Sequence, residues 1–236
     1  MNMKRFWINM NILYERLMLV AFIVALLVVC YGLYDTWYVF NKAQDDSYLN
    51  YKPRDGQGVP DDAPITGDMV AWLTIDDTNI DYPVMQGADN TKYLNLNPYG
   101  EYSLSGSIFL DSRNNKDFTD EYSILYGHHM EYGNMFGALD DFLDNSYLKK
   151  HSHGTLIVGR DGKRTYELGV FACIKVNVYD NKVLDPAPLK DISKIISEKA
   201  TYVNTSIDRS DHILALSTCI EPVSSNRLIV FCYVYE

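Results

Sequence analysis

The chain has 236 residues, of which 47% are apolar, 22% charged and 13% aromatic, and this balance excludes a disordered chain, a collagen-like repeat and a small disulfide-stapled protein. Acidic residues outnumber basic ones by 31 to 21, which gives a net charge of -10. A nucleic-acid-binding protein would show the opposite balance or a basic stripe, and the sequence has neither.

An uncharged apolar segment at residues 17–34 is the first distinct feature. As a helix it would be about 27 Å long, enough to cross the hydrocarbon core of a membrane. A buried core helix would interrupt such a run with a polar face. A cleaved signal peptide would have a shorter run and a small-residue cleavage site, whereas this run ends in Tyr31-Gly32-Leu33-Tyr34. We therefore predict an uncleaved membrane anchor.

Basic residues before the anchor predict its orientation. Lys4, Arg5 and Arg16 precede the span, and the positive-inside rule then places the N-terminus in the cytoplasm and the remainder outside. The predicted organisation is a short cytoplasmic N-terminus at 1–16, a transmembrane signal-anchor helix at 17–38, a linker or N-terminal helical wrap at 39–68, and one folded domain at 69–236. The protein is expected in the cell membrane, with a single pass and an extracellular domain.

The folded domain carries short β-branched and aromatic runs separated by turn residues. Eight of them predict strands: 70–75, 79–85, 106–111, 122–127, 155–159, 165–179, 212–219 and 227–235. Helices are predicted at 89–96, 134–142 and 186–203, and residues 41–51 can continue the anchor as a helix. Eight strands without a regular strand–helix–strand alternation favour an antiparallel or mixed β-barrel with helical insertions.

Cysteine usage singles out one residue. Cys30 lies in the span, and Cys173, Cys219 and Cys232 follow it, an odd number that does not suggest a disulfide framework. Cys173 and Cys232 lie within apolar runs and are expected to be buried as small hydrophobic residues. Cys219 ends a predicted strand just before a turn, where a thiol can be both held and exposed. It is the candidate nucleophile, although burial is the common fate of cysteine.

A reactive thiol needs a proton acceptor and a donor for the oxyanion of its tetrahedral intermediate. His128 and His129 follow a predicted strand, and Arg227 begins the strand after Cys219. The alternative for Arg227 is a solvated charge at the rim. A metal site built from His128-His129 and His151-x-His153 is a weaker rival, because adjacent histidines of an extended chain point to opposite sides and no H-E-x-x-H or Cys-x-x-Cys occurs. No metal or organic cofactor is expected.

These residues carry a family resemblance. Leu216-Ser217-Thr218-Cys219 followed by Arg227 resembles the sortase signature, and Tyr126-Gly127-His128 resembles the Gly-His of the same family. Several further segments resemble class B sortases in particular: Tyr82-Pro83-Val84-Met85-Gln86-Gly87, Asn90-x-x-Tyr93-Leu94, Gly106-Ser107-Ile108-Phe109-Leu110-Asp111-x-Arg113-Asn114 and Gly133-Asn134-Met135-Phe136. The resemblance extends from about residue 69 to the C-terminus. Ala215 replaces the first Thr of the signature.

The resemblance implies a sortase-like eight-stranded β-barrel after the transmembrane helix. It implies Cys219 as nucleophile, His128 as acid and base, and Arg227 as oxyanion or substrate clamp. Six further residues are, by position, candidates to line a peptide groove: Asn90, Leu94, Tyr126, Val183, Ser217 and Glu221.

The implied function is that of a cysteine transpeptidase of a Gram-positive envelope. It would cleave an NPQTN-like or xPxTG-like C-terminal sorting motif of exported proteins through a thioester. An amine of a lipid-linked peptidoglycan precursor would then resolve that thioester. The alternatives are a pilin-polymerising sortase, a hydrolytic cysteine peptidase and a non-enzymatic module that binds envelope peptides.

Overall fold

The computed structural model describes residues 3–43, 46–54, 56–177, 182–186, 189–218 and 226–236. The chain divides into two compact units, Met1–Lys42 and Ala43–Glu236.

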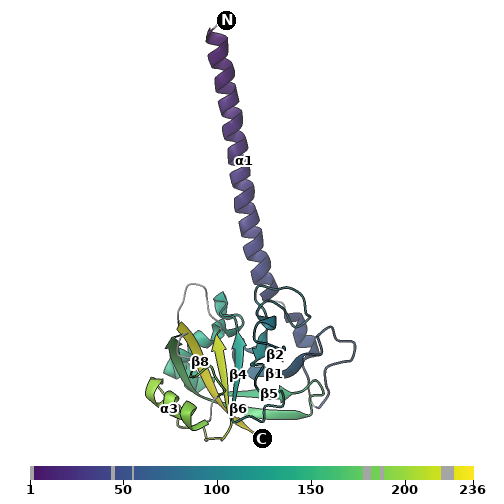
Figure 1. The fold of residues 1–236 in the computed structure, drawn as a ribbon, viewed down its shortest axis with the longest axis vertical. Helices are drawn as coiled ribbons and strands as arrows, with labels where there is room; N and C mark the ends of the chain where they lie inside the picture. The colour runs from purple at the N-terminus through teal and green to yellow at the C-terminus, as the bar shows by residue number, and fades with distance from the viewer. Residues whose placement is uncertain (1–2, 44–45, 55, 178–181, 187–188, 219–225) are drawn as a thin grey trace. The chain divides into compact units, whose positions relative to one another are not determined.

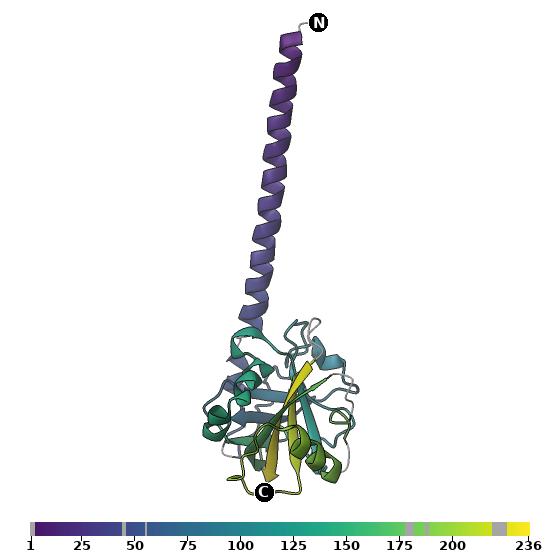
Figure 2. The ribbon, with the colours of Figure 1, turned by 90° about the vertical axis from the view of Figure 1, so that its left-hand side faces the viewer.

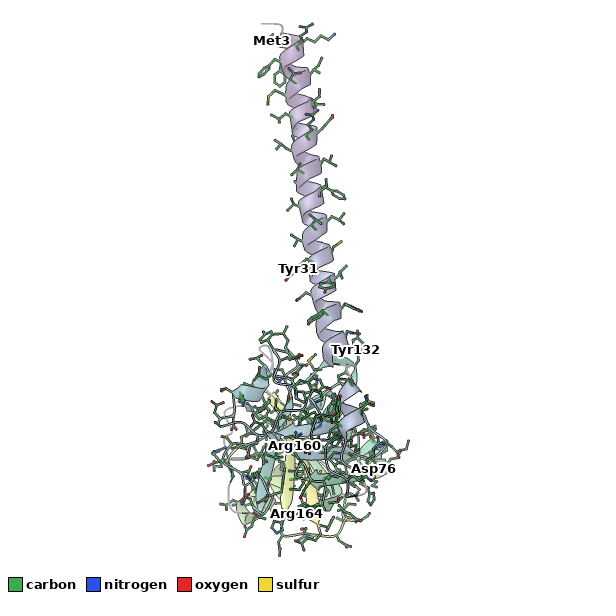
Figure 3. All side chains as sticks on the ribbon, turned by 90° about the vertical axis from the view of Figure 1, so that its right-hand side faces the viewer. Met3, Tyr31, Asp76, Tyr132, Arg160 and Arg164 are labelled. Atoms are coloured by element: carbon green, nitrogen blue, oxygen red, sulfur yellow. The ribbon has the colours of Figure 1, made fainter. Side chains whose placement is uncertain are left out.

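The first unit is a single long helix, α1 (Met3–Ala43), which extends beyond both ends of the predicted span at 17–38. Its segment Met3–Tyr38 contains an 18-residue window with a mean hydropathy of 2.7, and none of that window is buried. Figure 3 shows side chains projecting from all around the helix, among them the labelled Met3 and Tyr31. A helix with apolar side chains on every face fits a single-pass membrane anchor.

The second unit is built on a closed β-barrel, and each of the eight predicted strands is confirmed (Figure 1). The strands follow one another around the barrel in the order β1-β2-β3-β4-β7-β8-β6-β5. Their bounds are β1 (Met69–Ile75), β2 (Asp81–Met85), β3 (Ile108–Leu110), β4 (Tyr122–Gly127), β5 (His153–Val158), β6 (Arg164–Asn177), β7 (Ile213–Thr218) and β8 (Asn226–Tyr235).

The barrel is mixed rather than purely antiparallel. β2 pairs with β3 in parallel, and β4 pairs with β7 in parallel, whereas the other neighbouring strands are antiparallel. Figure 2 shows β8, in yellow, running down to the C-terminus. Because β7 is antiparallel to β8, the C-terminal ends of β4 and β7 lie together at the barrel end away from the C-terminus.

Large apolar side chains from every part of the barrel domain fill one core. Trp72, Phe109, Phe136, Phe142 and Phe231 are among the largest fully buried side chains. Their burial accounts for the β-branched and aromatic runs of the sequence, since these residues suit a pleated surface covered on both faces.

The helical elements differ more from the predictions. The described segments contain η1 (Asp46–Tyr51), η2 (Lys92–Leu94), η3 (Glu131–Gly133) and η4 (Phe136–Leu143), all of the 3-10 type, and the α-helices α2 (Asn145–Lys150) and α3 (Leu189–Lys199). The helix predicted at 89–96 is therefore reduced to one short turn, and that at 134–142 is a 3-10 helix. The helix predicted at 186–203 ends earlier, because Val203 forms a β-bridge with Ala172. The helix α2 was not predicted.

Several of the described residues between Asp46 and Asp68 contact the barrel. Tyr48 of η1 packs against the rings of Trp72 and Tyr82. The Lys52 ammonium donates to Asp81 Oδ1 at 2.7 Å. These contacts order the segment that joins the anchor to the barrel.

Candidate active site

The site is organised by the parallel pairing of β4 with β7. Tyr126 lies opposite Ser217, and Gly127 lies opposite Thr218, so the two strands end side by side. His128 is the residue directly after β4. The register therefore brings His128 to the barrel end at which β7 also ends.

The antiparallel pairing of β7 with β8 adds the third strand. Ser217 lies opposite Ile229, so Tyr126, Ser217 and Ile229 form one row across three strands. Directly opposed residues of a sheet share a face, and side chains two residues apart along a strand share it as well. Arg227 therefore lies on the same face as this row, one step nearer the barrel end.

Electrostatics agree with this placement of Arg227. Burial and the Asp111 carboxylate raise the pKa of Tyr126 well above its ordinary value, whereas the Arg227 guanidinium acts in the opposite direction. The two side chains are thus within electrostatic range of each other. The Arg227 Nε is buried and has no hydrogen-bond partner among the described residues. A buried, unpaired donor of this kind is available to a bound ligand.

His128 is held in place through its backbone. Its carbonyl accepts a hydrogen bond from the backbone N–H of Phe136 at 3.0 Å. Its ring Nδ1 is buried and has no hydrogen-bond partner in the part of the chain that the structure describes. Burial lowers the pKa of His128 below its ordinary value of 6.5. Burial thus favours the neutral form of the ring, which can accept a proton.

Three of the other four histidines contact groups away from His128. His129 pairs with Asp140 (Nε2 to Oδ2, 2.8 Å), His151 Nδ1 lies 3.4 Å from the Asp76 carbonyl, and His212 Nδ1 lies 3.0 Å from the Asp120 carbonyl. Within the described ranges, no group of three or more His, Cys, Asp or Glu side chains is arranged to hold a metal ion.

The predicted nucleophile Cys219 and the predicted groove residue Glu221 lie outside the described residues. The last described residue before them, Thr218, is still paired with β8, because its Oγ1 accepts a hydrogen bond from the Leu228 N–H at 3.1 Å. Cys173 and Cys232 are buried, as expected. Burial raises the pKa of Cys173 to about 12 and that of Cys232 further.

The comparisons with known proteins agree with this geometry. A model of the sortase domain family matches residues 73–234. The chain belongs to the sortase family. It is 33% identical to a protein named Sortase B of Listeria monocytogenes over 186 residues, which cover 77% of this chain and 74% of that protein.

Two solved structures are similar to this sortase and support its class. One is the class B sortase Spy0129 of Streptococcus pyogenes, involved in pilus biogenesis, with a TM-score of 0.65 and 36% identity over 72% of this chain and 94% of that chain. The other is a sortase B–substrate complex of Staphylococcus aureus, with a TM-score of 0.65 and 29% identity over 73% of this chain and 82% of that chain. The sortase described here is thus of class B, and its family consists of cysteine transpeptidases.

The predicted groove residues of this sortase differ in how much surface they expose. Asn90 and Leu94 are partly exposed, whereas Tyr126, Val183 and Ser217 are buried. The Asn90 side chain is largely committed, since its Oδ1 accepts from Ser112 N at 2.7 Å and its Nδ2 donates to Asp111 Oδ2 at 3.1 Å. One N–H of Asn90 is left for a further partner.

A buried carboxylate that the sequence reasoning did not single out joins several of these residues. Asp111 has no exposed surface. It accepts hydrogen bonds from the Tyr126 hydroxyl at 3.0 Å and from the Arg113 Nε and Nη2 at 2.9 and 2.8 Å. Burial would raise the pKa of Asp111, but the hydrogen bonds from Arg113 outweigh burial and lower it. The only signal in the sequence was the Asp111-x-Arg113-Asn114 segment of the class B resemblance.

Proposed function

We propose that this sortase is a membrane-anchored cysteine transpeptidase whose reaction is carried by Cys219, His128 and Arg227. The observation that carries the proposal is the strand register. β4 and β7 end side by side at the pair Gly127↔Thr218, and β8 begins at the same barrel end, so His128 and Arg227 flank the C-terminal end of β7. Cys219 is the residue directly after Thr218 in the sequence.

The proposed first half-reaction uses the three groups in distinct roles. His128 takes the thiol proton, and the Cys219 thiolate attacks a backbone carbonyl of the sorting motif. Arg227 donates hydrogen bonds to the resulting oxyanion. The C–N bond then breaks, His128 gives its proton to the leaving amine, and a thioester remains on Cys219.

The proposed second half-reaction regenerates the enzyme. An acceptor amine attacks the thioester while His128 removes its proton. The C–S bond breaks, a new amide forms, and the proton returns to the thiol. No net redox change or energy source is needed, because one amide bond is exchanged for another.

The proposed substrates are exported proteins with an NPQTN-like or xPxTG-like C-terminal motif. The proposed acceptor is an amine of a lipid-linked peptidoglycan precursor. The similar S. pyogenes sortase is involved in pilus biogenesis, which makes a pilin amine the second candidate. We further propose that Lys4, Arg5 and Arg16 keep the N-terminus of α1 in the cytoplasm, so that the barrel faces the outside.

The test is a peptide assay with the full-length chain in detergent micelles. Quenched peptides carrying either motif are incubated with and without triglycine, which presents a free amine. We expect cleavage and joining to triglycine in the wild type, and neither in Cys219→Ala. Arg227→Ala should lower kcat roughly 100- to 1,000-fold, as expected for the loss of an oxyanion donor. Arg164→Ala, at an exposed arginine of β6, is the matched control and should leave kcat unchanged.

Three results would contradict the proposal in different ways. Cleavage without joining to any amine would favour a hydrolytic peptidase. Cleavage that persists in Cys219→Ala would exclude the proposed nucleophile. An Arg227→Ala variant that keeps wild-type kcat would remove the oxyanion role of Arg227.

A further inference from the structure

Residues 183–185, which follow β6 and precede α3, are pinned to the barrel by side chains from distant parts of the chain. The Tyr122 hydroxyl of β4 donates to the Val183 carbonyl at 2.8 Å. From the loop after β3, Arg113 donates through Nη2 to the Leu184 carbonyl at 3.0 Å and through Nη1 to Asp185 Oδ1 at 2.5 Å. We call residues 183–185 the wall segment.

The wall segment lies over the sheet face that carries the active site. Tyr122 and Tyr126 are four residues apart on β4, so they share a face. That face also carries Ser217 and, one step further, Arg227. A peptide that reaches the site along this face must therefore pass beside the wall segment.

Arg113 is the one residue of the network that joins the wall segment to the buried Asp111. Its guanidinium contacts the Asp111 carboxylate, which is fully buried, on one side and Leu184 and Asp185 on the other. Asp111 in turn receives the Tyr126 hydroxyl. A planar guanidinium with several fixed N–H groups can bridge these partners at once, whereas a lysine ammonium presents a single point charge.

We propose that Arg113 is a positioning residue for the transpeptidation, which holds the wall segment in place as one side of the sorting-peptide site. The proposal rests on the proposed function and adds a residue outside the Cys219, His128 and Arg227 group. Among the described residues, the Arg113 side chain bonds to Asp111, Leu184 and Asp185, none of which belongs to that group. Its loss should therefore weaken peptide binding while leaving the chemistry of the thiol intact.

The first test compares Arg113→Lys with wild type, using the full-length chain in micelles. The lysine retains a positive charge beside Asp111 but cannot bridge to both partners on the wall segment. We expect KM for the sorting peptide to rise about tenfold, the effect of losing a charged hydrogen bond, while kcat changes less than about twofold. Partial unfolding would instead lower the apparent kcat at constant KM.

The second variant, Asp185→Asn, avoids the buried carboxylate altogether. Asp185 is 65% exposed, so the substitution leaves the core intact while weakening the bridge. It should raise KM in the same direction as Arg113→Lys. Arg164→Lys is the matched control, because Arg164 is comparably exposed. Its guanidinium lies 3.8 Å from the Asp117 carboxylate and, among the described residues, does not bond to Asp111 or to the wall segment. It should leave KM unchanged.

Two measurements separate the wall segment from the reaction itself. Hydrogen exchange of the amides at 183–185 should accelerate about tenfold in Arg113→Lys and not in Arg164→Lys. The alkylation rate of Cys219 by iodoacetamide, followed by mass spectrometry of its peptide, should be unchanged in both.

The outcomes distinguish the two proposals. Unchanged exchange at 183–185 in Arg113→Lys would show that Arg113 does not hold the wall segment. Faster exchange with unchanged KM would show that the wall segment does not contact the peptide. Wild-type protein that cleaves no sorting peptide would refute the proposed function, and the exchange measurement would still decide whether Arg113 fixes the wall segment.

Discussion

The glycine before His128 is expected to be essential because another chain segment packs directly against it. A Cβ placed on Gly127 would lie 2.7 and 2.8 Å from two ring carbons of Phe136 and closer still to the Ile108 side chain. Ordinary carbon contacts are about 3.5–4.0 Å, so the Phe136 ring would have to retreat by roughly 1 Å. Gly127→Ala should therefore destabilise the protein by about 1–3 kcal/mol, the usual cost of overpacking a core.

The same substitution should impair the reaction, because Phe136 also holds His128. The Phe136 N–H donates to the His128 carbonyl at 3.0 Å, so a shift of Phe136 displaces His128 as well. A misplacement of about 1 Å in a catalytic group can cost roughly 100-fold in rate. We expect kcat for peptide cleavage to fall by about that factor. The measurement uses protein that urea titration has shown to be folded under the assay conditions.

A control variant and a second-site substitution test this prediction. Gly67→Ala is the matched control, because a Cβ at Gly67 meets nothing within 4 Å, and it should change neither stability nor kcat. Phe136→Leu should recover part of the loss when combined with Gly127→Ala, with a coupling of about 1 kcal/mol or more. A Gly127→Ala variant with wild-type kcat and stability, or a double variant whose effects simply add, would show that this close packing does not position His128.

Two further predictions concern stability. Asp81→Ala should lower the free energy of unfolding by about 2–4 kcal/mol, because Asp81 Oδ1 accepts from both the Lys52 ammonium (2.7 Å) and the buried Trp72 Nε1 (2.6 Å). Urea unfolding measures this loss, and the exposed control Glu198→Ala should show little change. Burial lowers the pKa of His128 in the folded state below the 6.5 of the unfolded chain, so protonation favours unfolding. The free energy of unfolding should therefore fall as the pH decreases from 6.5 to the lowered pKa. His128→Gln should lose less stability than wild type between pH 7 and pH 5. Equal losses in the two proteins would exclude this contribution of His128.

The strands were predictable because their pattern is local. Runs such as 122–127 and 227–235 combine β-branched and aromatic residues and end at turn residues, and each forms a strand close to its predicted bounds. Burial on both faces of the barrel explains why these runs are almost continuously apolar. The sequence also predicted that two of the candidate catalytic residues lie at strand ends, and the structure places His128 directly after β4 and Arg227 at the start of β8.

The short helices were less predictable, because 3-10 and α-helices differ by only about 0.6 residue per turn, so their apolar residues have similar spacing over one or two turns. Phe136, Leu139 and Phe142 are all buried, and their spacing of three matches the 3-10 repeat. Met135 also has a φ of +50°, which prevents a helix from starting at Asn134. In the segment 89–96, the Asp89 carboxylate accepts from the N–H groups of Thr91 and Lys92 and closes a local turn instead.

The network around Asp111 depends on contacts between segments far apart in the chain, which no local pattern reveals. Asp111 follows a strand of three residues and looks like an ordinary loop carboxylate. Its burial becomes acceptable only because Arg113 and Tyr126 donate to it. Arg113 itself is 71 residues from Leu184 and 72 residues from Asp185 along the chain.

The parallel pairing of β4 with β7 is the feature that makes the candidate site possible. In an antiparallel pair, the C-terminal ends of the two strands would lie at opposite ends of the barrel, and the residues after Gly127 and Thr218 would be separated by a strand length. The parallel register Gly127↔Thr218 brings those two chain exits together instead. The antiparallel strand β8 must begin where β7 ends, so it starts at the same barrel end and supplies Arg227 there. Two distant parts of the sequence, the end of β4 and the β7–β8 pair, thus meet through one register, and a shift of β7 by a single residue would turn its side chains to the other face.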